Sequence, residues 1–72
     1  MRITTVDRDN ATVELSRTEV MILNSALNEV CNGIEVPEFE TRMGADIMEV
    51  RQLLTEMKAL LEKRALNQPR LL

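Results

Sequence analysis

The longest regular pattern of apolar residues lies in the last third of the chain. Its positions alternate at spacings of three and four residues, which places them on one side of an α-helix; they are Ile47, Val50, Leu54, Met57 and Leu61. Leu53 and Leu60 widen this stripe. Acidic residues at the start and basic residues near the end suit the helix dipole. We predict a long helix over residues 46–65 and a flexible tail over residues 67–72.

A second helical pattern precedes it. Its apolar residues again recur at steps of three and four; they are Val20, Leu23, Leu27, Val30 and Cys31, with Ile22 and Ala26 on the flank. Asn24 and Asn28 are assigned to the opposite, polar face. Ser16 and Glu19 have the spacing of a capping box, and Gly33 is a residue type that often closes a helix in the left-handed conformation. These signals predict a helix over residues 17–32.

A short helix is predicted between these two. Pro37 suits the first position of a helix, and Gly44 is expected to end it, which gives a helix over residues 37–43. Asp46 and Glu49 then repeat the capping-box spacing at the start of the long helix.

The N-terminal residues alternate in the manner of β-strands. Residues 2–6 and 11–15 are rich in β-branched side chains, and the polar cluster at residues 7–10 is typical of a turn, so we predict a β-hairpin over residues 2–15. Val13 and Leu15 fall on one face with Ala11, whereas Thr12 and Glu14 fall on the other. A two-stranded hairpin is only marginally stable alone, so we expect it to lie on a helix or to join another sheet.

Together these elements predict one small, mainly α domain over residues 1–66. An N-terminal β-hairpin is followed by a long, a short and a longest helix, with a corner similar to a helix-turn-helix between the last two. A chain of 72 residues buries only roughly 60 to 65 % of its unfolded surface. The stripe on the last helix is longer than the hairpin and the short helix are expected to cover, which favours a homodimer over a monomer whose hairpin reaches far enough. The expected self-association residues are Leu53, Met57, Leu60 and Leu61.

Composition removes most catalytic chemistries. The chain has no His, Trp or Tyr, one Cys and two Gly, so neither a His-activated nucleophile, a thiolate zinc site nor a glycine-rich phosphate loop can be built. We expect no enzyme activity, no catalytic residues, no cofactor and no metal site; a carboxylate enzyme would require two buried acids close together. No signal-peptide pattern or long apolar run is present, which favours a cytoplasmic protein without a membrane segment.

The charges are unevenly distributed. Residues 29–50 hold six acids and one base, a net charge of −5, whereas residues 51–72 hold five bases and two acids, a net charge of +3. The acidic middle segment favours a basic protein partner. The opposite net charges of the two segments also allow two copies to dock in an antiparallel arrangement. We expect a non-enzymatic interaction protein of the inhibitor, immunity or adaptor type, of bacterial or phage character. The expected partner-binding residues are Glu35, Glu38, Glu40 and Glu49.

Residues 39–53 resemble a helix-turn-helix, in which a short helix ends at a glycine and a second helix follows a small residue and a cap. The resemblance implies a DNA-binding transcriptional regulator, with Arg42, Arg51 and Gln52 as the DNA-binding residues. Glu40 stands where the family usually has a small residue, and the face that would enter the groove carries two acids against one base. Because DNA binding depends on neutralising phosphates, nucleic acid is the disfavoured alternative.

Overall fold

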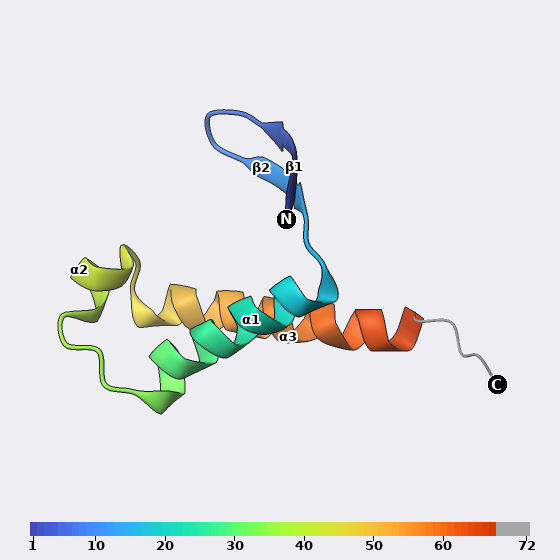
Figure 1. The fold of residues 1–72 in the computed structure, drawn as a ribbon. Helices are drawn as coiled ribbons and strands as arrows, with labels where there is room; N and C mark the ends of the chain where they lie inside the picture. Colours follow the sequence, from blue (N-terminus) through green and yellow to red (C-terminus); the bar gives the residue numbers. More distant parts are fainter. Residues whose placement is uncertain (68–72) are drawn as a thin grey trace.

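The computed structural model describes residues 1–67, with side chains up to residue 63, and contains a β-hairpin followed by a helical part (Figure 1). The elements in chain order are β1 (Arg2–Val6), β2 (Ala11–Glu14), α1 (Arg17–Asn28), the π-helix η1 (Glu29–Gly33), α2 (Phe39–Met43) and α3 (Ile47–Asn67). The predicted fold class, mainly α with an N-terminal hairpin, is confirmed. Most of the predicted tail, residues 68–72, lies outside the described residues.

The helical part is built on an antiparallel pair. α1 runs toward the end of the molecule that holds α2, and α3 runs back along it (Figure 1). Only four side chains of the described residues are buried; they are Val20, Cys31, Val50 and Leu54. Cys31 packs with Val50 and Leu54, and partly buried residues of the α2 corner, including Phe39 and Met43, surround them. The core is therefore small and lies mostly at the α2 end, and Cys31 is part of its packing.

Both predicted capping boxes are present. Ser16 Oγ accepts from the Glu19 N–H at 3.1 Å, and Glu19 Oε1 accepts from the Ser16 N–H at 2.8 Å. Asp46 Oδ1 accepts from the Glu49 N–H at 2.9 Å, and Glu49 Oε1 accepts from the Asp46 N–H at 3.3 Å. These bonds satisfy amide groups that have no partner inside the first turn, which is why the two helices begin where they do.

The end of the first helix differs from the prediction. Gly33 does not adopt the left-handed conformation; the helix widens into η1, and the Ile34 N–H donates to the Glu29 carbonyl oxygen at 3.0 Å. The wider turn satisfies that carbonyl without a left-handed residue. The short helix also begins at Phe39 rather than at Pro37, because Glu38 has a φ of 54° and leaves the helical region.

The assignment of Asn24 to the polar face of α1 is wrong. This residue lies four positions after Val20 and three before Leu27, so it shares their side of the helix and is partly buried. Its Oδ1 atom is buried and has no hydrogen-bond partner among the described residues. An amide is therefore placed on the side of α1 that the core uses.

The hairpin stands away from the helix pair (Figure 1). The strands are antiparallel, with Ile3 opposite Val13 and Val6 opposite Ala11, and the register shifts between Ile3 and Thr5. Every residue of both strands is exposed to solvent. The expectation that the hairpin lies on a helix is therefore not met in a single chain.

The hairpin turn and base are held by local bonds. Asp7 Oδ1 accepts from the N–H groups of Asp9 at 3.0 Å and Asn10 at 2.7 Å, which closes the predicted polar turn. Arg2 and Glu14 form an ion pair across the strands. At the base, the N-terminal amine of Met1 pairs with Glu19 of α1. The hairpin is tied to α1 by this ion pair and by the chain itself.

A membrane-spanning helix is not found in residues 1–67, where no helix combines sufficient length with sufficient apolar character.

Candidate protein-binding surfaces

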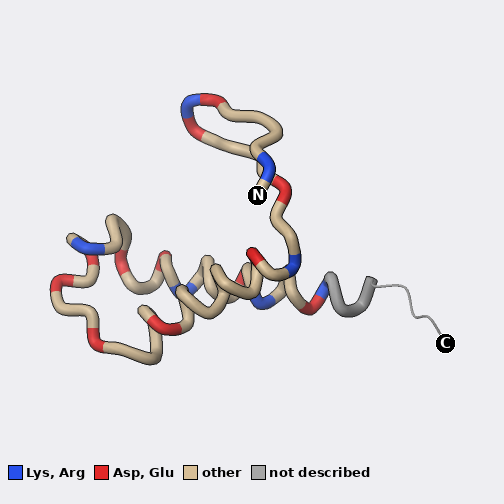
Figure 2. The backbone as a smooth tube through the Cα atoms, viewed as in Figure 1, with Lys and Arg blue, Asp and Glu red and all other residues tan. Residues whose placement is uncertain are grey.

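The acidic residues gather at the end of the molecule formed by α2 and the start of α3 (Figure 2). A shallow cleft of about 430 Å³ opens here between the two helices. Its lining combines carboxylates and apolar side chains; the residues are Glu38, Phe39, Glu40, Thr41, Asp46 and Ile47. We refer to this feature as the acidic cleft.

Two left-handed residues shape the acidic cleft. Gly44, with a φ of 75°, ends α2, and its N–H donates to the Glu40 carbonyl oxygen at 2.8 Å. Glu38 adopts the left-handed backbone conformation at the other end of α2. Its carbonyl oxygen accepts a hydrogen bond from the Arg42 N–H at 3.1 Å. Phe39 packs against the buried cluster. A five-residue helix is thus held with its acidic side chains beside the first turn of α3.

The carboxylates of this end are not neutralised by ion pairs. Among the side chains that the structure describes, the ion pairs join Arg2 to Glu14 and the amine of Met1 to Glu19, both far from the acidic cleft. The acidic carboxylates of this cleft are therefore available to an incoming partner, and apolar surface from Phe39 lies directly beside them.

The structure separates the four predicted partner-binding residues. Glu38 and Glu40 line the acidic cleft. Glu35 lines a separate depression with Val36 and Pro37. Glu49 is exposed, but its carboxylate accepts a hydrogen bond from the N-terminus of α3.

Asp46 joins Glu38 and Glu40 in the acidic cleft, although the sequence suggested only a capping role for it. The position of Asp46 directly after Gly44 and Ala45 could have indicated this role, because a turn at these two residues places the start of α3 beside α2.

The predicted self-association residues divide into two pairs. Leu53 and Leu60 are exposed, with 47 % and 39 % of their surfaces accessible. Met57 and Leu61 are partly buried. The four residues therefore do not form one free face of α3.

The residues expected to contact DNA in the alternative interpretation are Arg42, Arg51 and Gln52, and all three are exposed. The corner between α2 and α3 has the left-handed glycine that the helix-turn-helix resemblance implies. However, α2 has only five residues, and the first turn of α3 lies beside Glu40 and Asp46. Negative charge at this position opposes a phosphate backbone.

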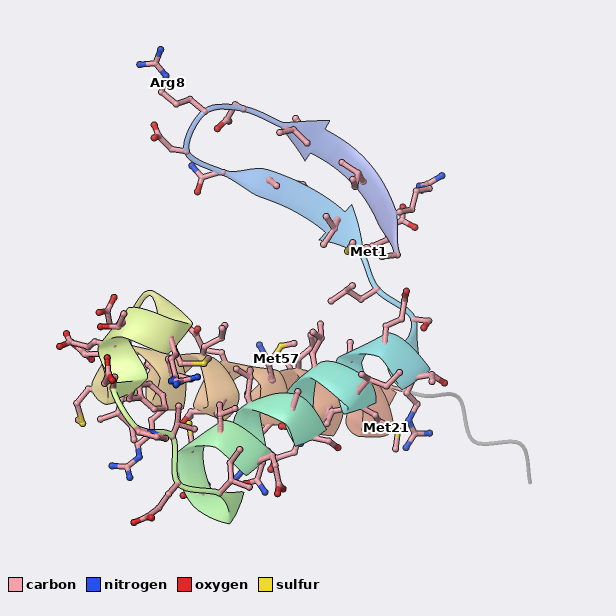
Figure 3. The ribbon with its side chains drawn as sticks, turned by 60° about the vertical axis from the view of Figure 1, so that its left-hand side comes forward. Met1, Arg8, Met21 and Met57 are labelled. Atoms are coloured by element: carbon pink, nitrogen blue, oxygen red, sulfur yellow. The ribbon has the colours of Figure 1, made fainter. Side chains whose placement is uncertain are left out.

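A second, apolar cleft of about 200 Å³ lies between the base of the hairpin and α1. It is lined by Met1, Leu15, Glu19, Ile22 and Leu23, and we refer to it as the apolar cleft. Figure 3 shows Met1 at the base of the hairpin, above α1, and Met21 on the opposite side of that helix. The sequence did not predict this cleft, because it depends on the angle between the hairpin and α1.

Glu19 has the clearest electrostatic perturbation. Its hydrogen bond to the N-terminal amine, supported by its bond to the Ser16 N–H, lowers the pKa of the carboxyl from 4.5 to about 2. The carboxylate therefore stays charged at the edge of the apolar cleft.

Residues 1–63 contain no group of three Cys, Asp or Glu side chains placed to hold a metal ion. In comparisons with known proteins, no family model, no curated protein and no solved structure matches this chain. The functional argument therefore depends on the geometry of the two clefts.

Proposed function

We propose that the protein is a non-enzymatic interaction module of the inhibitor, immunity or adaptor type. It binds a basic segment of another protein in the acidic cleft and self-associates through a surface that includes α3.

The observation that carries this proposal is the composition of the acidic cleft. Glu38, Glu40 and Asp46 surround apolar surface, and none of them forms an ion pair with a described side chain, although Arg42 lies on the same short helix. A Lys or Arg side chain has an apolar stem and a charged end, so it can place the stem on Phe39 or Ile47 and the charge among the carboxylates. A basic partner therefore fits this surface better than a nucleic acid does.

The proposal is tested by fluorescence anisotropy with a labelled peptide in which Lys and Arg alternate with Leu. We expect binding that weakens as salt is added, because the carboxylates and the peptide charges are exposed and therefore screened. The double variant Glu38→Lys, Glu40→Lys should weaken binding about tenfold or more.

The control is the double variant Asp9→Lys, Glu62→Lys, which changes the net charge equally at exposed positions outside the acidic cleft. Equal losses of peptide affinity in both double variants would show that binding depends only on net charge. They would therefore reject a defined site. A labelled DNA duplex is measured in parallel at low salt. DNA binding that is lost in Arg51→Ala would replace the proposal with the transcriptional-regulator alternative.

A further inference from the structure

The two faces of the hairpin differ completely in polarity. Residues that are directly opposite in an antiparallel pair share a face, so Ile3 lies with Val13, and Val6 lies with Ala11. Ala11 and Val13 are two positions apart on β2, which places all four side chains on one face. The opposite face carries Arg2 with Glu14 and Thr5 with Thr12.

The irregularity in β1 is what produces this separation. Ile3 and Val6 are three positions apart, so in a regular strand they would point to opposite faces. The register shift between Ile3 and Thr5 inserts one extra residue and brings Val6 back to the face of Ile3. The hairpin thus has a wholly apolar face, yet Ile3 is 62 % and Val6 is 67 % exposed.

The helix pair has an apolar flank on the side toward the hairpin. On α1 this flank includes Ile22 and Leu23, which line the apolar cleft. Figure 3 shows Met57 of α3 on the same side of the helix pair. Leu53 and Leu60 lie four positions before and three after Met57, so they share that side of α3. Ile22, Leu23, Leu53 and Leu60 are all more than a third exposed.

The apolar face of the hairpin and the apolar flank of the helix pair therefore meet only at the apolar cleft, and they are separated elsewhere. We refer to these two surfaces as the apolar walls. Figure 1 shows the hairpin rising from the start of α1 and leaning over the helix pair. An isolated two-stranded hairpin is only marginally stable in water, and exposed apolar faces of this kind mark association surfaces. What covers these walls must itself present apolar surface in the same geometry.

We infer that a second copy of this chain covers them, with the open sides of the two molecules facing each other across a two-fold axis. The inference rests on the self-association proposed above but assigns it to the hairpin face and the helix flank together, rather than to α3 alone. The hairpin of each copy then closes the open end of the other, and the four apolar walls enclose one shared core. Such an interface is isologous, as in most small homodimers.

The charge distribution fits this arrangement. The helix pairs of the two copies run in opposite directions, so the acidic end of one copy lies beside the second half of α3 in the other. Residues 29–50 carry a net charge of −5, whereas residues 57–67, the second half of α3, have three bases and one acid, a net charge of +2. In the described part of α3, Lys58 and Lys63 are exposed. Opposite charges therefore meet at both ends of the two-fold interface, whereas a parallel arrangement would bring the two acidic ends together.

The test compares two adjacent residues of β1 by sedimentation equilibrium of the full chain. Val6→Asp places a charge on the apolar face, and the matched control Thr5→Asp places the same charge on the polar face. We expect the wild type and Thr5→Asp to be dimers, and Val6→Asp to raise the dimer dissociation constant about tenfold or more. Leu60→Asp should weaken the dimer as well.

Each other outcome has a defined meaning. If Leu60→Asp dissociates the dimer and Val6→Asp does not, α3 alone forms the interface; the inference is then wrong, and the proposed self-association stands. A wild type that is monomeric at every accessible concentration would reject both the inferred interface and the proposed self-association. Peptide binding at the acidic cleft is tested separately by fluorescence anisotropy.

A second measurement remains decisive even if Val6→Asp fails to fold. Isotope-filtered NMR on a mixture of labelled and unlabelled wild-type chains detects contacts between copies. We expect contacts from the Val6 methyl groups to apolar side chains of the other copy. Contacts of Val6 that are found only within one chain would overturn the inference.

Discussion

At the scale of single residues, Glu19 connects the base of the hairpin to the start of α1. Its carboxylate accepts from the Ser16 N–H at the start of α1 and pairs with the N-terminal amine at the base of the hairpin. Both interactions require the charged carboxylate, so they lower its pKa from 4.5 to about 2. The orientation of the hairpin relative to α1 is therefore linked to the charge of one residue.

This linkage predicts a defined pH dependence for Glu19→Gln. Because the pKa is lower in the folded chain than in the unfolded chain, the charged carboxylate stabilises the fold above pH 4.5, and this contribution is lost as the pH falls toward about 2. In urea denaturation, the wild type should be more stable than Glu19→Gln at pH 7, and the difference should disappear near pH 2. A difference that is the same at both pH values would contradict this account.

At the scale of elements, Gly44 in the corner between α2 and α3 is required for its backbone conformation rather than for lack of space. A Cβ atom on Gly44 would meet no heavy atom within 4 Å, but the residue has a φ of 75°. At Gly33, which is not left-handed, a Cβ would come within 2.5 Å of the flexible Glu29 side chain. Only Gly44 is therefore required by its backbone conformation, and it is the glycine that shapes the acidic cleft.

The pair Gly44→Ala and Gly33→Ala tests this difference. Gly44→Ala should lower the free energy of unfolding by about 1 kcal/mol, because an L-residue is strained in the left-handed region. It should also weaken peptide binding at the acidic cleft. Gly33→Ala should cost less, since the Glu29 side chain can move toward solvent. Chemical denaturation of both variants measures the two costs, and a larger loss at Gly33 would be inconsistent with a corner set by the φ of Gly44.

At the scale of the whole molecule, the buried core occupies only part of the structure. Four side chains are buried, whereas eleven large apolar residues of the described part are exposed, including Ile3, Val6, Ile22 and Leu53. The hairpin projects from the side of the helix pair without adding to that core (Figure 1). A single chain thus leaves more large apolar side chains in water than it buries.

Association makes stability depend on protein concentration. If two copies share a core, the midpoint of thermal unfolding should rise as the protein concentration is increased, because mass action favours the associated folded state. Calorimetry or circular dichroism over a wide concentration range measures this shift. In Val6→Asp the midpoint should be nearly independent of concentration. A wild-type midpoint that does not change with concentration would count against a shared core.

The local elements were predictable because they depend on neighbouring residues. The two capping boxes, the polar turn at residues 7–10 and the glycine that ends α2 each use contacts within a few positions of the chain. Asn24 was assigned to the polar face because its residue type outweighed its position in the helical repeat. The π-helix η1 was missed because its wider hydrogen-bonding pattern has no marker in the sequence.

The candidate site was predictable only in part. Acidic residues concentrated in one segment indicated a surface for a basic partner, and Glu38 and Glu40 do line one cleft. The exclusion of Glu35, the inclusion of Asp46 and the capping role of Glu49 depend on how two turns orient α2 against α3.

The sequence by itself determined which segments form strands and helices and where the negative charge accumulates, since periodicity, capping and composition act over short distances. Only the tertiary structure decided which side chains share a surface. The apolar face of the hairpin depends on one inserted residue in β1, and its exposure depends on the direction in which the chain passes from β2 into α1. Such long-range geometry results from the sum of many weak contacts, and no single stretch of sequence encodes it.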